Sequence, residues 1–249
     1  MEKLNIHFTH MSGHNKWSQI KRQKGTNDAK RSKVFTKLGK MISLLSRAGG
    51  DPDANPALKI AVEKAKQVNM PADNIQKAIK KGMGELEGEK MEEILYEAYG
   101  PEGIPLIIEA TTDNNNRTVA EVKHILSKYG GRLGESGSVK WMFDHFGYLE
   151  IPLGAKINAE EVELQAIELG AEDVNVSADL AVIFVKPEDL YLVKSGLESG
   201  GYKISEAGFE WRAKNKVRVD AEVSRKIETL FEALDEQDDV NEIYSNLED

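Results

Sequence analysis

The sequence lacks cysteine, and this absence excludes several classes of site. Without cysteine among its 249 residues, the chain has no disulfide, no thiol nucleophile, no cysteine-ligated zinc and no iron–sulfur cluster. No apolar run approaches the roughly eighteen residues that a transmembrane helix needs. The first residues do not resemble a secretory signal peptide, so we expect a cytoplasmic protein.

Catalytic and metal-binding motifs are also missing. The glycine-rich stretch at residues 130–138 has no lysine where a phosphate-binding loop requires one, and Ser138 stands where a nucleophile elbow needs glycine. None of the five histidines has a metal-ligand spacing. We therefore expect no catalytic residue, no metal site and no cofactor. A metal-dependent enzyme that uses the acidic clusters stays as an alternative from another class.

Charge is distributed very unevenly along the chain. The formal net charge is −9, yet residues 1–81 carry +11 and residues 82–249 carry −20. Residues 11–50 hold ten basic side chains and a single acidic one, Asp28. A basic end on an acidic body suggests a polyanion-binding end, because lysine and arginine pair with phosphates and release counterions.

Hydrophobic periodicity predicts a helix within this basic end. Apolar side chains recur at helical spacing on one face: Val34, Phe35, Leu38, Met41, Ile42 and Leu45. Lys33, Lys37 and Lys40 fall on the opposite side with Lys30, so we expect them to face solvent. Two shorter apolar patterns follow before Gly82, and together the three patterns predict a small helical bundle.

The candidate nucleic-acid contacts all lie in this basic end. We expect the following residues to contact phosphates, bases or sugar: His14, Lys16, Trp17, Lys21, Arg22, Lys24, Lys30, Arg31, Lys33, Lys37 and Lys40. Trp17 among basic residues suits stacking on an unpaired base. Anchoring Trp17 and Ile20 on the bundle is an equally good interpretation, so both stay open.

After Gly82 the pattern changes to mixed strands and helices, which makes the fold class α+β. We expect strands at 95–99, 104–111 and 139–143, with a helix before the last of them. From Tyr148 the order strand, helix, strand, strand, helix, strand is the ferredoxin-like βαββαβ pattern. A final helix and strand have no partner of their own, so we expect them to return to the middle sheet.

These patterns predict three domains after a tail. The tail is residues 1–10, and the basic helical domain is a three-helix bundle at residues 11–82. A discontinuous α/β domain takes residues 83–146 and 212–249. The third domain, ferredoxin-like, is inserted into it at residues 147–211.

Several short motifs resemble the YebC/PmpR family. They include Ser12 to Trp17, Asp28 to Lys33, Asn69-Met70-Pro71, Thr112-Asp113-Asn114, Asn116-Arg117-Thr118, Trp141-Met142-Phe143 and Asp238-Asp239-Val240. The family includes bacterial proteins described as probable transcriptional regulators and the mitochondrial translational activator of cytochrome c oxidase. The resemblance runs from Met11 to about Leu247 and implies the same three domains.

The resemblance implies a non-enzymatic, nucleic-acid-binding regulatory protein. One expectation is a transcriptional regulator that binds DNA through its basic N-terminal domain. The alternative is a ribosome-associated translation factor that binds ribosomal RNA and relieves stalling, for example at proline runs. Both would place the basic end on a phosphate backbone, with the ribosome or the transcription machinery as partner and no membrane. The sequence predicts no oligomeric state.

Overall fold

The protein folds into two compact units, which are described separately. The computed structural model describes residues 28–86, 90–154 and 157–248. One unit contains residues 145–210, and the other contains the described residues up to 144 together with those from 211 onward. The chain therefore leaves the second unit and returns to it, as an inserted domain requires. The helical bundle and the middle sheet share the second unit, so the limits proposed for the three domains stay a prediction.

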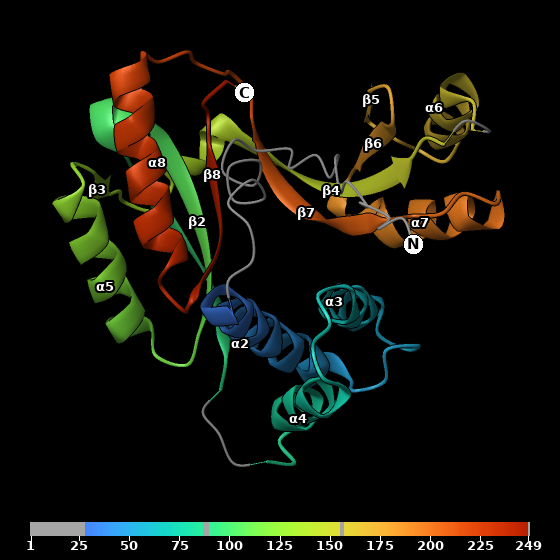
Figure 1. Ribbon diagram of the computed structural model, residues 1–249, viewed down its shortest axis with the longest axis horizontal. Helices are drawn as coiled ribbons and strands as arrows, with labels where there is room; N and C mark the ends of the chain where they lie inside the picture. The colour runs from blue at the N-terminus through green and yellow to red at the C-terminus, as the bar shows by residue number, and fades with distance from the viewer. Residues whose placement is uncertain (1–27, 87–89, 155–156, 249) are drawn as a thin grey trace, which may run out of the picture. The chain divides into compact units, whose positions relative to one another are not determined.

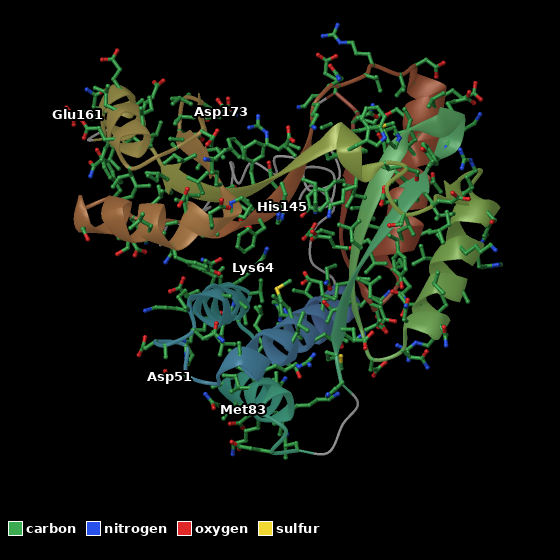
Figure 2. The ribbon with its side chains drawn as sticks, turned by 180° about the vertical axis from the view of Figure 1, so that it is seen from behind. Asp51, Lys64, Met83, His145, Glu161 and Asp173 are labelled. Carbon is green, nitrogen blue, oxygen red and sulfur yellow. The ribbon has the colours of Figure 1, made fainter. Side chains whose placement is uncertain are left out.

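The described part of the basic end, residues 28–82, forms the expected three-helix bundle (Figure 1). Its helices are α2 (Asp28–Leu45), extended by the 3₁₀ turn η1 (Ser46–Ala48), α3 (Pro56–Gln67) and α4 (Ala72–Gly82). Asn55 caps α3 by accepting the backbone N–H of Leu58, and Pro56 takes the first helical position. The core contains Leu38, Ile42, Leu58, Ala61, Val62, Ala65, Met70, Ile75 and Ile79. Figure 2 shows Lys64 on α3 and Met83 just after α4.

The middle sheet has four strands in the order β3-β1-β2-β8. They are β1 (Glu92–Tyr99), β2 (Pro105–Thr112), β3 (Arg132–Leu133) and β8 (Val240–Ser245), with helices α5 (Asn115–Lys128) and α8 (Ala221–Asp235). Both helices lie on one side of the sheet in Figure 1. Strand β8 pairs antiparallel with β2, which confirms that the last helix and strand return to this sheet.

The loop before the inserted domain differs from the sequence-based expectation. Residues 139–143 are not a strand: a 3₁₀ turn, η3 (Lys140–Met142), precedes strand β4 (Phe143–Pro152). Glu97 on β1 explains the bend, because its buried carboxylate accepts the backbone N–H groups of Gly137, Val139 and Lys140 at 2.6 Å each. Burial acts to raise the Glu97 pKa, but the N–H donors and the nearby Lys140 charge outweigh it and hold the pKa below its ordinary value.

The inserted unit has the ferredoxin-like order predicted from the sequence. Its elements are β4, α6 (Ala159–Glu168), β5 (Asp173–Val176), β6 (Leu180–Val185), the turn η4 (Pro187–Asp189), α7 (Leu190–Ser199) and β7 (Glu206–Ala213). The sheet order is β5-β6-β4-β7, and β6 pairs antiparallel with both β4 and β5. Strand β6 is buried along its whole length, as a central strand requires.

The bundle depends on a close crossing of α4 and α2 at Gly82. A Cβ at this position would overlap the backbone oxygen of Ser43 and the hydroxyl of Ser46. Gly82→Ala should therefore lower the free energy of unfolding by roughly 1–3 kcal/mol. Gly39→Ala in α2 is the matched control, since its Cβ would meet only Met70 Cε at 3.8 Å and should stabilise the helix by about 0.5–1 kcal/mol. Urea unfolding that gives both variants the same sign would contradict this packing.

Glu109 gives the middle sheet a pH dependence near neutrality. Burial, with repulsion from Glu242 and Glu93, raises its pKa to about 7, although Trp211 Nε1 donates to it at 2.8 Å. Because the folded pKa is raised, stability is greatest below the ordinary glutamate pKa and falls as pH rises through 7. Glu109→Gln should reduce the slope of the thermal transition temperature against pH between pH 5 and pH 8. An unchanged slope would mean that Glu109 titrates normally.

Candidate nucleic-acid interface

Three lysines of α2 lie against the end of α8 rather than facing solvent. Lys33, Lys37 and Lys40 form a row at helical spacing along α2. The Lys37 ammonium pairs with Asp235 at 2.9 Å, Lys33 pairs with Glu236, and Lys40 pairs with Asp239. The exposed fractions of the three lysine side chains, in the order Lys33, Lys37 and Lys40, are 34%, 11% and 16%. We call these three residues the lysine row.

The end of α8 explains why the row docks there. A helix C-terminus carries partial negative charge, and α8 ends in acidic residues with no basic side chain in its last turn. The lysine row offsets both sources of negative charge. Besides its carboxylate, each lysine donates to a backbone oxygen: Lys33 to Glu236 at 2.9 Å, Lys37 to Asp235 at 2.7 Å and Lys40 to Asp238 at 3.0 Å.

The expectation that this row faces open solvent is therefore wrong. Helical periodicity correctly places the row opposite the bundle core, but it does not show that another helix covers that side. The row's predicted role as a phosphate contact stays a prediction. Such contact would have to displace the carboxylates that now hold the lysines.

Asp239 is the central carboxylate of this contact. It is 1% exposed and accepts from Lys40 Nζ, from Thr118 Oγ1 at 2.7 Å and from Arg117 Nη2 at 2.9 Å. Gln237 Nε2 adds a fourth donor at 3.2 Å. Burial acts to raise the Asp239 pKa, but the four donors outweigh it and hold the pKa far below its ordinary range. The Asp239 carboxylate is therefore ionised, and both Lys40 and Arg117 pair with it.

The loop between β2 and α5 presents Arg117 and Thr118 to Asp239. Asn114 caps α5 by accepting the backbone N–H of Arg117, which fixes the first turn. Thr112 Oγ1 lies 2.8 Å from Thr118 Oγ1 and donates to it, because the Thr118 hydroxyl gives its single hydrogen to Asp239. Thr112 Oγ1 also accepts from Arg117 Nη2 at 3.3 Å. Arg117 also pairs with Asp113 at 2.9 Å, and hydrogen bonds to Asp239 and Asp113 raise its pKa above the usual arginine value. The guanidinium is thus committed to the protein's own carboxylates.

Other cations of the bundle remain at its surface. Arg31, Lys66, Lys77 and Lys80 are exposed. Within the described residues, no ion pair involves any of these four. On α4, the apolar Ile75 and Ile79 point into the core, so Lys77 and Lys80 lie on the outer face of the helix. We call these four residues the exposed cation set.

Most of the predicted contacts lie outside the described residues. These are His14, Lys16, Trp17, Lys21, Arg22 and Lys24, so the two interpretations of Trp17 both stay open. Lys30 belongs to the first turn of α2, but its side chain is not described. Of the predicted contact residues, the structure therefore describes the side chains of the lysine row and Arg31 alone.

The described residues show little that suits other chemistry. Over residues 28–86, 90–154 and 157–248, no group of three or more His, Asp or Glu side chains is arranged to hold a metal ion. His124 is exposed on α5, and the ring of His145 lies 5.7 Å from that of Phe209. No helix in this part of the chain is long and apolar enough to cross a membrane.

Two protein-family models match nearly all of the chain. Residues 15–85 match the TACO1/YebC protein N-terminal domain, and residues 91–247 match the TACO1/YebC second and third domain. The chain belongs to the TACO1/YebC family. A relative from Pseudothermotoga lettingae, named "Probable transcriptional regulatory protein", is 48% identical over 239 residues, or 96% of this chain and 94% of the relative. An Aquifex aeolicus relative with the same name is 46% identical over 240 residues, or 96% of each chain.

A solved structure supports the TACO1/YebC fold. The crystal structure of a conserved hypothetical protein, Aq1575, from Aquifex aeolicus has a TM-score of 0.79 and 45% identity, covering 89% of this chain and 91% of that one. The resemblance predicted from sequence motifs is therefore confirmed, as is the mixed helix and sheet fold. The names of the two relatives describe those proteins as probable transcriptional regulators.

The contact around Asp239 is the feature that sequence reasoning missed. The sequence motifs contain Arg117-Thr118 and Asp238-Asp239, but nothing in either motif predicts that they meet Lys40. The signal that could have found the contact is the acidic end of α8, Asp235-Glu236, which lacks a basic residue of its own. A row of lysines elsewhere in the chain is the natural partner for such an end.

Replacing the central carboxylate tests this contact. Asp239→Asn removes the carboxylate charge that pairs with both Lys40 and Arg117. The substitution should therefore lower the free energy of unfolding by roughly 3 kcal/mol or more. Asp238→Asn is the matched control, because its side chain is exposed and its change should stay within about 0.5 kcal/mol. Urea unfolding at pH 7 measures both. Equal decreases in the two variants would contradict the role of Asp239.

The contribution of Asp239 to the free energy of unfolding should decrease in acid. Because the folded Asp239 pKa is depressed, its contribution is present above the ordinary aspartate pKa, about 4, and disappears as pH falls below it. The stability difference between the wild-type protein and Asp239→Asn should therefore narrow from pH 6 towards pH 2.

Proposed function

We propose that this protein is a non-enzymatic, nucleic-acid-binding regulator that acts in the cytoplasm and binds DNA through its basic helical domain. The relatives' names, probable transcriptional regulatory proteins, support the regulatory class. The observation that carries the proposal is the exposed cation set, which has no carboxylate partner among the described residues. Phosphates are the partner that such a surface favours.

The lysine row takes a secondary place in this proposal. Its ammonium groups already hold the carboxylates of Asp235, Glu236 and Asp239. A phosphate backbone would bind there only by leaving those carboxylates unpaired. We therefore assign the first phosphate contact to the exposed cation set together with the N-terminal residues from His14 to Lys24.

The acidic remainder of the chain limits non-specific binding. Residues 82–249 carry −20, and this net charge repels a polyanion over most of the surface away from the bundle. The bundle would then bind tightly only where a partner or a particular site adds to its electrostatic attraction. This charge division suits a regulator better than a general coating protein.

A triple substitution tests the exposed cation set. Replacing Lys66, Lys77 and Lys80 with alanine should weaken duplex DNA binding, and the slope of log affinity against log salt should fall by about 0.9 for each phosphate that is no longer neutralised. Lys80 also lies in the last turn of α4, where its charge stabilises the helix by a few tenths of a kcal/mol, so the thermal transition must be measured in parallel.

The matched control removes the same charge elsewhere. Replacing Lys186, Lys203 and Lys226 with alanine should leave the affinity and its salt dependence nearly unchanged. Equally weakened binding in the two triple variants would show that net charge alone drives binding and would overturn the assignment to the bundle. Measurement is by fluorescence anisotropy with a labelled duplex over a salt series.

Crosslinking in cell extract identifies the nucleic acid. At physiological salt, sequencing of the crosslinked material should recover DNA with the wild-type protein and should recover much less with the bundle variant. Recovery of ribosomal RNA instead, with co-sedimentation of the protein with ribosomes, would favour the ribosome-associated alternative and overturn the DNA assignment.

A further inference from the structure

A basic and aromatic cluster interrupts the acidic body. Residues 122–143 contain four basic side chains, Lys123, Lys128, Arg132 and Lys140, and a single acidic one, Glu135. This segment is therefore net positive inside a region that carries −20. It covers the second half of α5, the edge strand β3 and the turn η3.

Three cations of this segment each lie against an aromatic ring. Arg132 lies 4.2 Å above the ring of Tyr99, Lys140 lies 5.2 Å from the ring of Trp211, and Lys128 lies 5.2 Å from the ring of Tyr129. Basic side chains set among aromatic rings are typical of surfaces that bind single-stranded nucleic acid.

Trp141 supplies a strongly exposed ring in this segment. Its side chain is 65% exposed, although tryptophan is usually highly buried. The indole Nε1 donates to the backbone oxygen of Ser138 at 3.1 Å, and Tyr99 donates its hydroxyl to the same oxygen at 3.0 Å. The polar atom of the indole is thus bound internally while the ring remains accessible.

The loop that carries Trp141 is held rigidly. Glu97 binds the backbone N–H groups of Gly137, Val139 and Lys140, so three hydrogen bonds fix the turn on both sides of Ser138. Val139 and Phe143 are buried in the core beneath the loop. A ring presented in this way has little conformational entropy left to lose on stacking.

The surroundings favour a nucleobase over a protein partner. An apolar docking surface needs a contiguous patch, but Trp141 is the one large exposed apolar side chain within residues 90–144 and 211–248. Lys140, next to it in sequence, is exposed, and so is Arg132 of the same segment. A flat ring with adjacent positive charge matches a base attached to its phosphates.

We propose that Trp141 stacks on an unpaired nucleobase, while Arg132 and Lys140 contact the phosphates that flank it. The ligand is a single-stranded segment of RNA or DNA. The inference deepens the proposed function and rests on it, because it adds a base-contacting site to a protein that binds phosphates through its bundle.

Alanine at position 141 tests the stacking. Trp141→Ala should weaken binding of a labelled single-stranded oligonucleotide roughly fivefold to a hundredfold, as expected when one stacked base no longer has its ring. Trp141→Phe, which keeps a smaller ring, should lie between the wild-type protein and the alanine variant. Comparing the affinities of RNA and DNA oligonucleotides of the same sequence shows which nucleic acid the site prefers.

Two controls separate stacking from charge and from folding. An abasic oligonucleotide of the same length should bind the wild-type protein and Trp141→Ala equally, since no base remains to stack. Leu192→Ala, at another exposed apolar side chain, should change neither affinity nor fold. The exposed ring of Trp141 predicts an unchanged thermal transition for its variants. The slope of log affinity against log salt should also stay the same, because no charge is removed.

The outcomes distinguish this inference from the proposed function. If Trp141→Ala binds the single strand as well as the wild-type protein while the bundle triple variant binds weakly, the inference is overturned and the proposed function stands. If the wild-type protein binds neither duplex nor single strand at low salt, both fail. If Trp141→Ala instead fails to bind a protein partner and keeps its affinity for the oligonucleotide, Trp141 is a protein-docking residue and the inference is wrong.

Discussion

The contact between the lysine row of α2 and the acidic end of α8 determines how charge is used in this protein. Lysine side chains far from α8 in sequence supply the positive charge that the helix end lacks. Asp239 then links that contact to Arg117 and Thr118, and through them to the first turn of α5. One buried carboxylate thereby joins the bundle, the loop after β2 and the turn before β8.

This arrangement changes what the basic composition means. Counted along the sequence, the N-terminal region looks like one continuous cationic surface. In the folded chain, part of that charge balances the protein's own carboxylates and stabilises the contact of α2 with α8. A count of lysines therefore overstates the attraction for a polyanion. The electrostatic surface is set by the cations that have no carboxylate nearby.

Sequence periodicity predicts the elements of this protein well, because helices and strands follow from local spacing. The apolar face of α2, the cap at Asn55 and the βαββαβ order all depend on residues close in sequence. Periodicity places the lysine row on the correct face of α2 but does not predict its carboxylate partners, because they are about 200 positions away and no local pattern carries that information. Residues 139–143 look like a strand for the same reason: Glu97, on a distant strand, bends them into a turn. The two-residue strand β3 is too short to give any periodicity.

The candidate site shows the same limit more sharply. Residue type and local charge are enough to identify a cationic domain, but not to decide which cations a ligand can reach. A phosphate at Lys37 would have to offset the broken Asp235 pair, which is partly buried and therefore stronger than an exposed pair. A phosphate at Lys77 would break no ion pair with any described residue. The same polyanion should therefore occupy the outer face of α4 before the lysine row, although both carry similar charge. The order in which these cations bind phosphate therefore depends on their partners in the folded chain more than on the amino-acid composition.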